Sequence, residues 1–133
     1  MCELVSIDTN YGEKVMVAAI KHDEITNIIK SASLCKNIDM LILFGSSLTK
    51  RCDDDSDIDI AVISKYTVYR LCKLKSFHVF IENIYSYSHE QSYDFLYYKS
   101  YDDVVHWAES ELVSSEILNK GKIIYKRLKN DDK

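Results

Sequence analysis

The chain has 133 residues, of which 47% are hydrophobic and 29% charged, and its formal net charge at pH 7 is −4. These values are ordinary for a globular protein and predict one domain over residues 1–133. The acidic balance argues against nucleic acid as a partner. No apolar run is long enough to span a bilayer, and residues 1–20 lack a secretory signal, so we expect no membrane association and a cytoplasmic location.

The first part of the chain predicts helix followed by a buried strand. Residues 1–12 show no clear period and are expected to be frayed. Apolar residues recur at helical spacing over residues 13–36, which predicts one or two amphipathic helices. Residues 39–44, DMLILF, form a short apolar run that Gly45 ends, and they predict a buried strand. Residues 46–51 can form one helical turn.

The middle of the chain contains the clearest strand. Residues 57–64, DIDIAVIS, alternate with a period of two, which places Asp57, Asp59 and Ala61 on one face and Ile58, Ile60 and Val62 on the other. Residues 66–89 carry apolar side chains at helical spacing and predict a helix packed on the sheet. Residues 93–98, YDFLYY, predict a third strand.

The last part of the chain completes the predicted order of elements. Residues 102–120 are mostly helical in composition, and Gly121 is a suitable residue after the helix end. Residues 122–126, KIIYK, predict a last short strand, and residues 127–133 a solvated tail. The order helix, strand, strand, helix, strand, helix, strand predicts an α/β (α+β) fold with one small mixed sheet packed with helices.

An unusual density of negative charge precedes the clearest strand. Five carboxylates fall within seven positions: Asp53, Asp54, Asp55, Asp57 and Asp59. Like charges repel, and removing even one carboxylate from water costs on the order of several kcal/mol. Either water solvates these side chains or bound cations neutralise them.

The spacing of two of these aspartates suits a metal site. Asp57 and Asp59 stand two residues apart on a predicted strand, with Cα atoms about 6.6 Å apart at a rise of ~3.3 Å per residue. Their oxygens are the ligands that Mg²⁺ prefers and shares with substrate phosphates. Asp94, near the start of the next apolar strand, is the candidate third ligand of a two-metal site. Asp53, Asp54 and Asp55 fit a solvated loop better than a metal site. Without the upstream Gly-Ser pair and the downstream Asp94, Asp57 and Asp59 would also fit a solvated loop that leads into a strand.

Gly45 and Ser46 form a second candidate site. They end a buried strand and open a turn, where glycine allows close backbone approach and N–H groups can bind an anion. The Ser46 hydroxyl adds a donor. The chain has no Walker A motif, and a Gly-Ser pair alone is a weak signal. Its value lies in the ten residues that separate Ser46 from Asp57.

These residues resemble a known family. GSSLTKRCDDDSDID, residues 45–59, has the GS-x10-DxD pattern of the polymerase-β-type nucleotidyltransferases. Residues 20–126 resemble the minimal nucleotidyltransferase (MNT) branch, in which a hydrophobic strand precedes GS and a third aspartate, matched by Asp94, opens a later strand. The I-L-x-x-G-x-x-x-Y ending of that branch is matched by residues 117–125.

The resemblance implies a polymerase-β-like fold and a reaction. In that reaction NMP, usually AMP from ATP, passes from an NTP to an acceptor hydroxyl, and pyrophosphate is released. Gly45 and Ser46 would hold the triphosphate, and Asp57 and Asp59 would bind two Mg²⁺ ions. Asp94 would bind the catalytic metal and help deprotonate the acceptor.

The chain departs from the family pattern at two positions. Many relatives have an arginine soon after GS and a second glycine four positions after the serine, whereas this chain has Ser47 and Lys50 there. We count Ser47 and Lys50 among the candidate nucleotide-binding residues. Lys50 or Arg51 is expected to replace the missing positive charge.

The resemblance also suggests how an acceptor is recognised. The chain ends just after the last predicted strand, so we expect a second copy or another protein to complete the acceptor site. MNT proteins commonly pair with a helical HEPN protein, as antitoxin to toxin, and adenylylation of a toxin tyrosine is the leading interpretation. The alternatives are a homodimeric adenylyltransferase for a small molecule of the antibiotic type, and a non-catalytic module that binds nucleotide or masks a partner.

Overall fold

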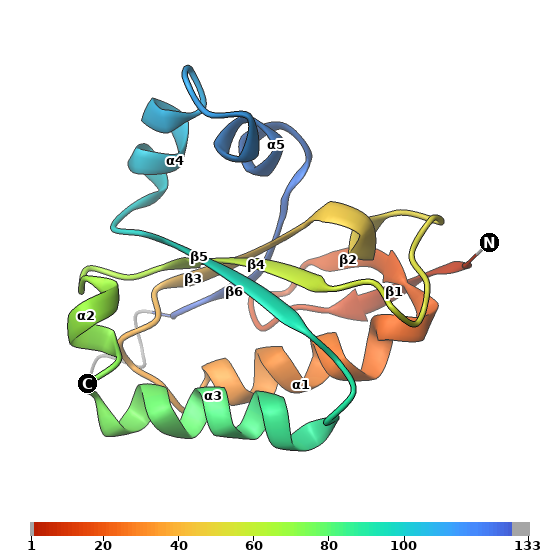
Figure 1. Ribbon diagram of the computed structural model, residues 1–133, viewed down its shortest axis with the longest axis horizontal. Coiled ribbons are helices and arrows are strands. Elements are labelled where there is room, and N and C mark those ends of the chain that lie inside the picture. The colour runs from red at the N-terminus through yellow and green to blue at the C-terminus, as the bar shows by residue number, and fades with distance from the viewer. Residues whose placement is uncertain (1, 129–133) are drawn as a thin grey trace.

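A four-stranded mixed sheet forms the centre of the computed structural model, which describes residues 2–128 (Figure 1). The strand order is β5-β4-β3-β6. Strand β3 (Met40–Phe44) runs antiparallel to β4 (Ile58–Ile63) and to β6 (Lys122–Lys126), whereas β4 and β5 (Tyr93–Tyr98) are parallel. The predicted α+β class with one small mixed sheet is confirmed.

Helices cover both faces of this sheet (Figure 1). Helices α1 (His22–Ala32) and α3 (Lys75–Tyr87) lie on one face, and α4 (Tyr101–Trp107) and α5 (Leu112–Lys120) lie on the other. The short helix α2 (Val68–Leu71) and α3 belong to the crossover that the parallel pairing of β4 and β5 requires. None of the helices described is both long and apolar enough to cross a bilayer.

Strand β4 is apolar on both faces beyond its first residues. Ile60 and Val62 belong to the core cluster under α1 and α3, while Ala61 and Ile63 belong to the cluster under α4 and α5. All four side chains are buried. Because successive strand residues point to opposite faces, this confirms the predicted alternation. Asp59 is therefore the last polar position before the strand enters the core.

Two of the predicted helical segments are each divided into two helices. Residues 66–89 form α2 and α3, and residues 102–120 form α4 and α5 with a break between them. Helix α4 begins after Ser100, whose hydroxyl accepts a hydrogen bond from the backbone N–H of Asp103 at 3.2 Å. Such a cap satisfies a donor that has no partner within the helix.

The N-terminal segment differs most from its prediction. Residues 1–12 were expected to be frayed, but β1 (Leu4–Asp8) pairs antiparallel with β2 (Lys14–Ala18) in a two-stranded sheet. In β2 the buried Val15 alternates with the exposed Met16, so the local period is two, and the helix predicted over residues 13–36 begins only at α1. The error arose because a short apolar run fits either period.

Asn10, in the turn of this hairpin, attaches it to β6. Its side-chain amide donates to the Lys126 carbonyl at 2.5 Å, and its oxygen accepts from the Lys126 N–H at 2.9 Å. The Tyr11 hydroxyl donates to the Ile123 carbonyl at 2.6 Å. Because β6 is at the edge of the sheet, these contacts satisfy backbone groups that would otherwise be open to pairing.

Arg127, after β6, is attached to the segment that precedes β3. The guanidinium of Arg127 lies 2.8 Å from the Asp39 carboxylate, and its backbone N–H donates to the Asp39 carbonyl at 2.9 Å. The prediction of a solvated tail over residues 127–133 is therefore wrong for Arg127. Residues 129–133 lie outside the described residues.

We expect Asn10→Ala to lower the free energy of unfolding by about 1–3 kcal/mol, because it removes two hydrogen bonds to β6. Chemical denaturation measures this change. Asn119→Ala is the matched control, since Asn119 is exposed and bonds only within its own helix. Equal effects of the two substitutions would contradict the anchoring role of Asn10.

Candidate functional site

Three aspartates lie at the end of the sheet where β4 and β5 begin. Asp59 is the direct partner of Asp94 in the parallel register and of Phe44 in the antiparallel one. Directly paired residues point to the same face of a sheet, with neighbouring strands about 4.8 Å apart. Asp57 immediately precedes β4, and its charge acts on the Asp59 carboxylate. The structure therefore brings together the three carboxylates that the sequence singled out.

The Asp59 carboxyl group is electrostatically destabilised. Its pKa is raised from 3.8 to about 6, first by burial and then by the charges of Asp94, Asp57 and Glu116. The ion pairs among the described residues are Lys14–Asp8, His22–Asp23 and Arg127–Asp39, and all of them lie elsewhere.

Clustered carboxylate oxygens without a counter-charge are the donor set that a hard divalent cation neutralises, so these residues fit such an ion. Across residues 2–128, however, no three His, Cys, Asp or Glu side chains stand in a geometry that could hold a metal ion. The carboxylates are near one another but do not form a preformed ligand shell. Binding of Mg²⁺ by Asp57, Asp59 and Asp94 therefore stays a prediction.

Gly45 makes the closest backbone approach to this cluster. Its φ is +80°, and a Cβ atom built on it would lie 2.2 Å from Oδ2 of Asp59. Any side chain here would strain the backbone and displace the carboxylate. Glycine thus allows the turn η2 (Gly45–Leu48), predicted over residues 46–51, to begin directly beside Asp59.

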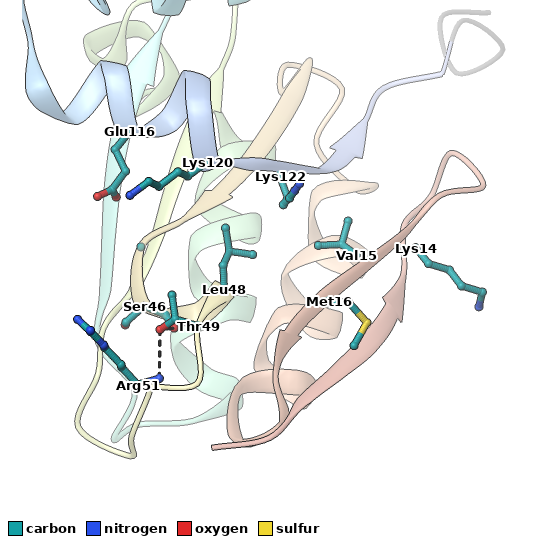
Figure 2. Close-up of a pocket in the computed structure, with 11 residues that line it drawn as sticks. Lys14, Val15, Met16, Ser46, Leu48, Thr49, Arg51, Glu116, Lys120 and Lys122 are labelled. Atoms are coloured by element: carbon teal, nitrogen blue, oxygen red, sulfur yellow. Dashed lines mark hydrogen bonds between the residues drawn. The ribbon is translucent and has the colours of Figure 1, made fainter. Parts of the chain in front are cut away.

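A pocket of about 680 Å³ opens next to Gly45 and Ser46 (Figure 2). Its charged lining residues come from β2, the segment after η2, α5 and β6: Lys14, Arg51, Glu116, Lys120 and Lys122. In Figure 2, Glu116 and Lys120 project from α5 toward the segment that carries Ser46 and Arg51, whereas Lys14 points away from them. Lys14 is paired with Asp8, but Arg51, Lys120 and Lys122 still outnumber Glu116, and this balance favours an anionic ligand.

Two of the predicted nucleotide-binding residues are not part of this pocket. Ser47 is completely buried, and its hydroxyl has no hydrogen-bond partner among the described residues. Lys50 is exposed and lines a separate hollow of about 520 Å³ with Asp53 and Asp54. Arg51 lines both hollows. Of the two residues expected to replace the missing charge, only Arg51 lies beside Gly45.

The remaining aspartates form the predicted loop. The Asp53 carboxylate accepts hydrogen bonds from the Asp55 N–H at 2.9 Å and from the Ser56 hydroxyl at 3.1 Å, and that hydroxyl accepts from the Asp53 N–H at 3.0 Å. Asp53, Asp54 and Asp55 are exposed. Their interpretation as a solvated loop is confirmed, and Ser56 stabilises the turn that precedes Asp57.

Sequence reasoning missed the contribution of α5. The available signal was the pair of lysines on either side of Gly121. From the sequence, Gly121 was interpreted only as the residue after a helix end. A Cβ atom at Gly121 would lie 2.8 Å from Cγ2 of Ile42, so glycine lets the end of α5 pack closely on β3. That packing brings Lys120 and Lys122 to the pocket, and no local pattern in the sequence shows it.

Asp59→Asn is predicted to stabilise the metal-free protein at pH 7.5 by about 1–2 kcal/mol, after allowance for solvent screening. The pKa of Asp59 is about 6 in the folded state and 3.8 in the unfolded state. The protonated Asp59 side chain therefore stabilises the folded protein, and this stabilisation is fully present below about pH 4. That stability is lost as the pH rises through about 6, and asparagine stays neutral throughout.

Denaturation of both proteins from pH 4 to 8 measures the difference, which should shrink toward pH 4. Asp54→Asn, in the exposed loop, is the control and should change little. A less stable Asp59→Asn protein at pH 7.5 would contradict the unfavourable effect of burial and neighbouring charge on the Asp59 carboxylate.

Comparison with known proteins agrees with this geometry. Residues 23–130 match the family described as polymerase beta, nucleotidyltransferase, and this segment contains Gly45, Asp57, Asp59 and Asp94. No curated protein matches the chain at a significant level. The mixed sheet packed between helices is consistent with the fold of the matched family, whose general reaction is NMP transfer from an NTP with a divalent metal. The chain belongs to the polymerase β nucleotidyltransferase family.

Proposed function

We propose that this protein transfers AMP from ATP to a hydroxyl group of a partner protein, with two Mg²⁺ ions held by Asp57, Asp59 and Asp94. One observation carries the proposal: Asp59, whose pKa is raised by burial and by the charges of Asp94 and Asp57, lies against Gly45, which lines a pocket with several basic side chains. A nucleoside triphosphate with its metal ions complements both halves of this arrangement, because it presents cations to the acids and phosphates to the bases.

The pocket next to Gly45 would receive the triphosphate. Its volume of about 680 Å³ is within the usual range for small-ligand sites. The backbone N–H groups of the Gly45–Ser46 turn and the Ser46 hydroxyl would donate to phosphate oxygens. Arg51 and Lys120 would supply positive charge, which supports the expectation that another cation replaces the family arginine. The choice of ATP rests on the family resemblance.

The transfer itself needs few groups from the chain. The acceptor oxygen attacks the α-phosphorus, the bond from that phosphorus to the bridging oxygen breaks, and pyrophosphate leaves. Asp94 would accept the proton of the acceptor hydroxyl. Asp57 and Asp59 would hold the metal ions against which the nucleotide is oriented. Two Mg²⁺ ions, when bound, would offset the charge of the attacking and leaving oxygens.

Exposed apolar side chains on α4 and α5 support a protein as the acceptor. Helices α4 and α5 cover the sheet face to which Asp59 and Asp94 point, since the same face carries Ala61 and Leu96. Large apolar side chains on these helices are exposed: Val105, Trp107, Leu112 and Val113, of which Leu112 is 93% exposed. Trp107 and Val113 line one hollow, and exposed apolar side chains that gather in this way suit a protein contact. The family resemblance suggests a HEPN-type toxin tyrosine as acceptor, with this protein as its antitoxin.

Asp57→Asn is predicted to lower the rate of AMP transfer to a co-purified partner by at least about 100-fold, because it removes a metal-ligand charge. The assay follows labelled ATP in the presence of Mg²⁺. Asp54→Asn, three residues away and exposed, should stay within about twofold of the unsubstituted protein.

Undiminished transfer by Asp57→Asn would refute the proposed catalytic role. Labelling of small hydroxyl compounds without any partner would instead favour the small-molecule alternative. Neutralisation of a partner in cells by an Asp57→Ala/Asp59→Ala protein would favour the non-catalytic one.

A further inference from the structure

Lys21 is the only charged side chain that is buried among residues 2–128, with 2% of its surface exposed. It ends the short turn η1 (Ala19–Lys21) that leads into α1. Its ammonium group donates to Oε1 of Gln91 at 2.6 Å and to the Asp54 carbonyl at 3.3 Å. Burial of an ammonium group is costly unless its donors are satisfied, and neither of these partners carries a formal negative charge.

Gln91 links Lys21 to the segments that lead into β4 and β5. It is 8% exposed, and its amide nitrogen donates to the Ser56 carbonyl at 3.0 Å and to the Ser92 carbonyl at 2.7 Å. The Ser92 carbonyl also accepts from the Ile58 N–H at 3.1 Å. Ser56 immediately precedes Asp57, and Ser92 precedes Asp94 by two residues.

The bridge therefore joins the backbone just before two of the three aspartates. Asp59 needs no such support, because it lies within β4 and its register is set by β3 and β5. Asp57, in contrast, precedes β4, and Asp94 is the second residue of the edge strand β5. An apolar residue in place of Lys21 could fill the same space but could not hold the Asp54 carbonyl or orient Gln91.

We propose that Lys21 and Gln91 are positioning residues, whose hydrogen-bond bridge sets the spacing between Asp57 and Asp94 for divalent-cation binding. The proposal rests on the proposed function, in which these aspartates hold metal ions. Removal of a side chain that orients a metal ligand by a hydrogen bond commonly lowers metal affinity about 10- to 100-fold, although that side chain does not contact the ion.

The main test uses the double variant Lys21→Met/Gln91→Met in the full chain. Replacement of a buried polar pair by apolar residues of similar size is often tolerated. We expect Mn²⁺, measured by electron paramagnetic resonance, to bind at least about 10-fold more weakly than to the unsubstituted protein. The Ile58 amide should also exchange its hydrogen faster, because its acceptor carbonyl is no longer held.

Ser64→Ala is the matched control at the opposite end of β4. The buried Ser64 hydroxyl donates to the Asn37 carbonyl at 2.6 Å and accepts from the Tyr66 N–H at 3.2 Å. Its loss should lower stability without changing Mn²⁺ affinity. Mn²⁺ affinity is measured for each protein at the same number of degrees below its own midpoint of thermal unfolding. This separates a local effect on Asp57 and Asp94 from general destabilisation.

Gln91→Glu provides a second variant that keeps a partner for Lys21 but removes both amide donors. Its added negative charge would by itself favour a cation, so weaker Mn²⁺ binding can come only from lost positioning. Unchanged Mn²⁺ affinity and unchanged Ile58 exchange in either folded variant would overturn the proposal. If the unsubstituted protein binds no Mn²⁺, the proposed function fails instead, and Ile58 exchange alone decides whether the bridge orders these strands.

Discussion

Repulsion between carboxylates at one end of the sheet is the interaction on which the rest of this structure depends. Parallel pairing of β4 with β5 places Asp59 directly beside Asp94, and Asp57, which immediately precedes β4, lies close enough for its charge to act on Asp59. Burial first, and then the charges of Asp94, Asp57 and Glu116, raise the pKa of Asp59, and the ion pairs among the described residues all lie elsewhere. The arrangement is unfavourable for the protein alone and favourable once positive charge is added.

The surrounding fold explains how such a site is assembled from distant parts of the chain. The N-terminal hairpin, the turn after β3, helix α5 and strand β6 all contribute to the pocket beside Gly45. Asn10 fixes the hairpin to β6, and Gly121 lets α5 approach β3. Acidic and basic groups thus occupy adjacent regions, and Gly45 stands at their boundary because only glycine fits against Asp59.

Much of this organisation could be predicted where the signal is local. The alternation of DIDIAVIS predicted β4, and with the apolar run YDFLYY it predicted that Asp59 and Asp94 open neighbouring strands. The glycine that ends β3 was expected to allow close backbone approach, and it does so against Asp59. These features depend on short-range periodicity and on backbone sterics, which the sequence carries directly.

Features that depend on tertiary contacts were not predictable. The hairpin of β1 and β2 is held by hydrogen bonds between Asn10 and a residue 116 positions away. Lys120 and Lys122 reach the pocket only because α5 packs on the sheet, and Ser47 turns out to be buried rather than available to a ligand. In each case the decisive interaction joins segments whose sequences give no sign of their contact.

The most direct measurement of the central claim is anomalous X-ray scattering from crystals grown with Mn²⁺ and a non-hydrolysable ATP analogue. The account predicts manganese peaks within bonding distance of Asp57, Asp59 and Asp94, with the triphosphate lying along the Gly45–Ser46 turn. Manganese bound elsewhere, with these three carboxylates bare while the nucleotide is present, would contradict it.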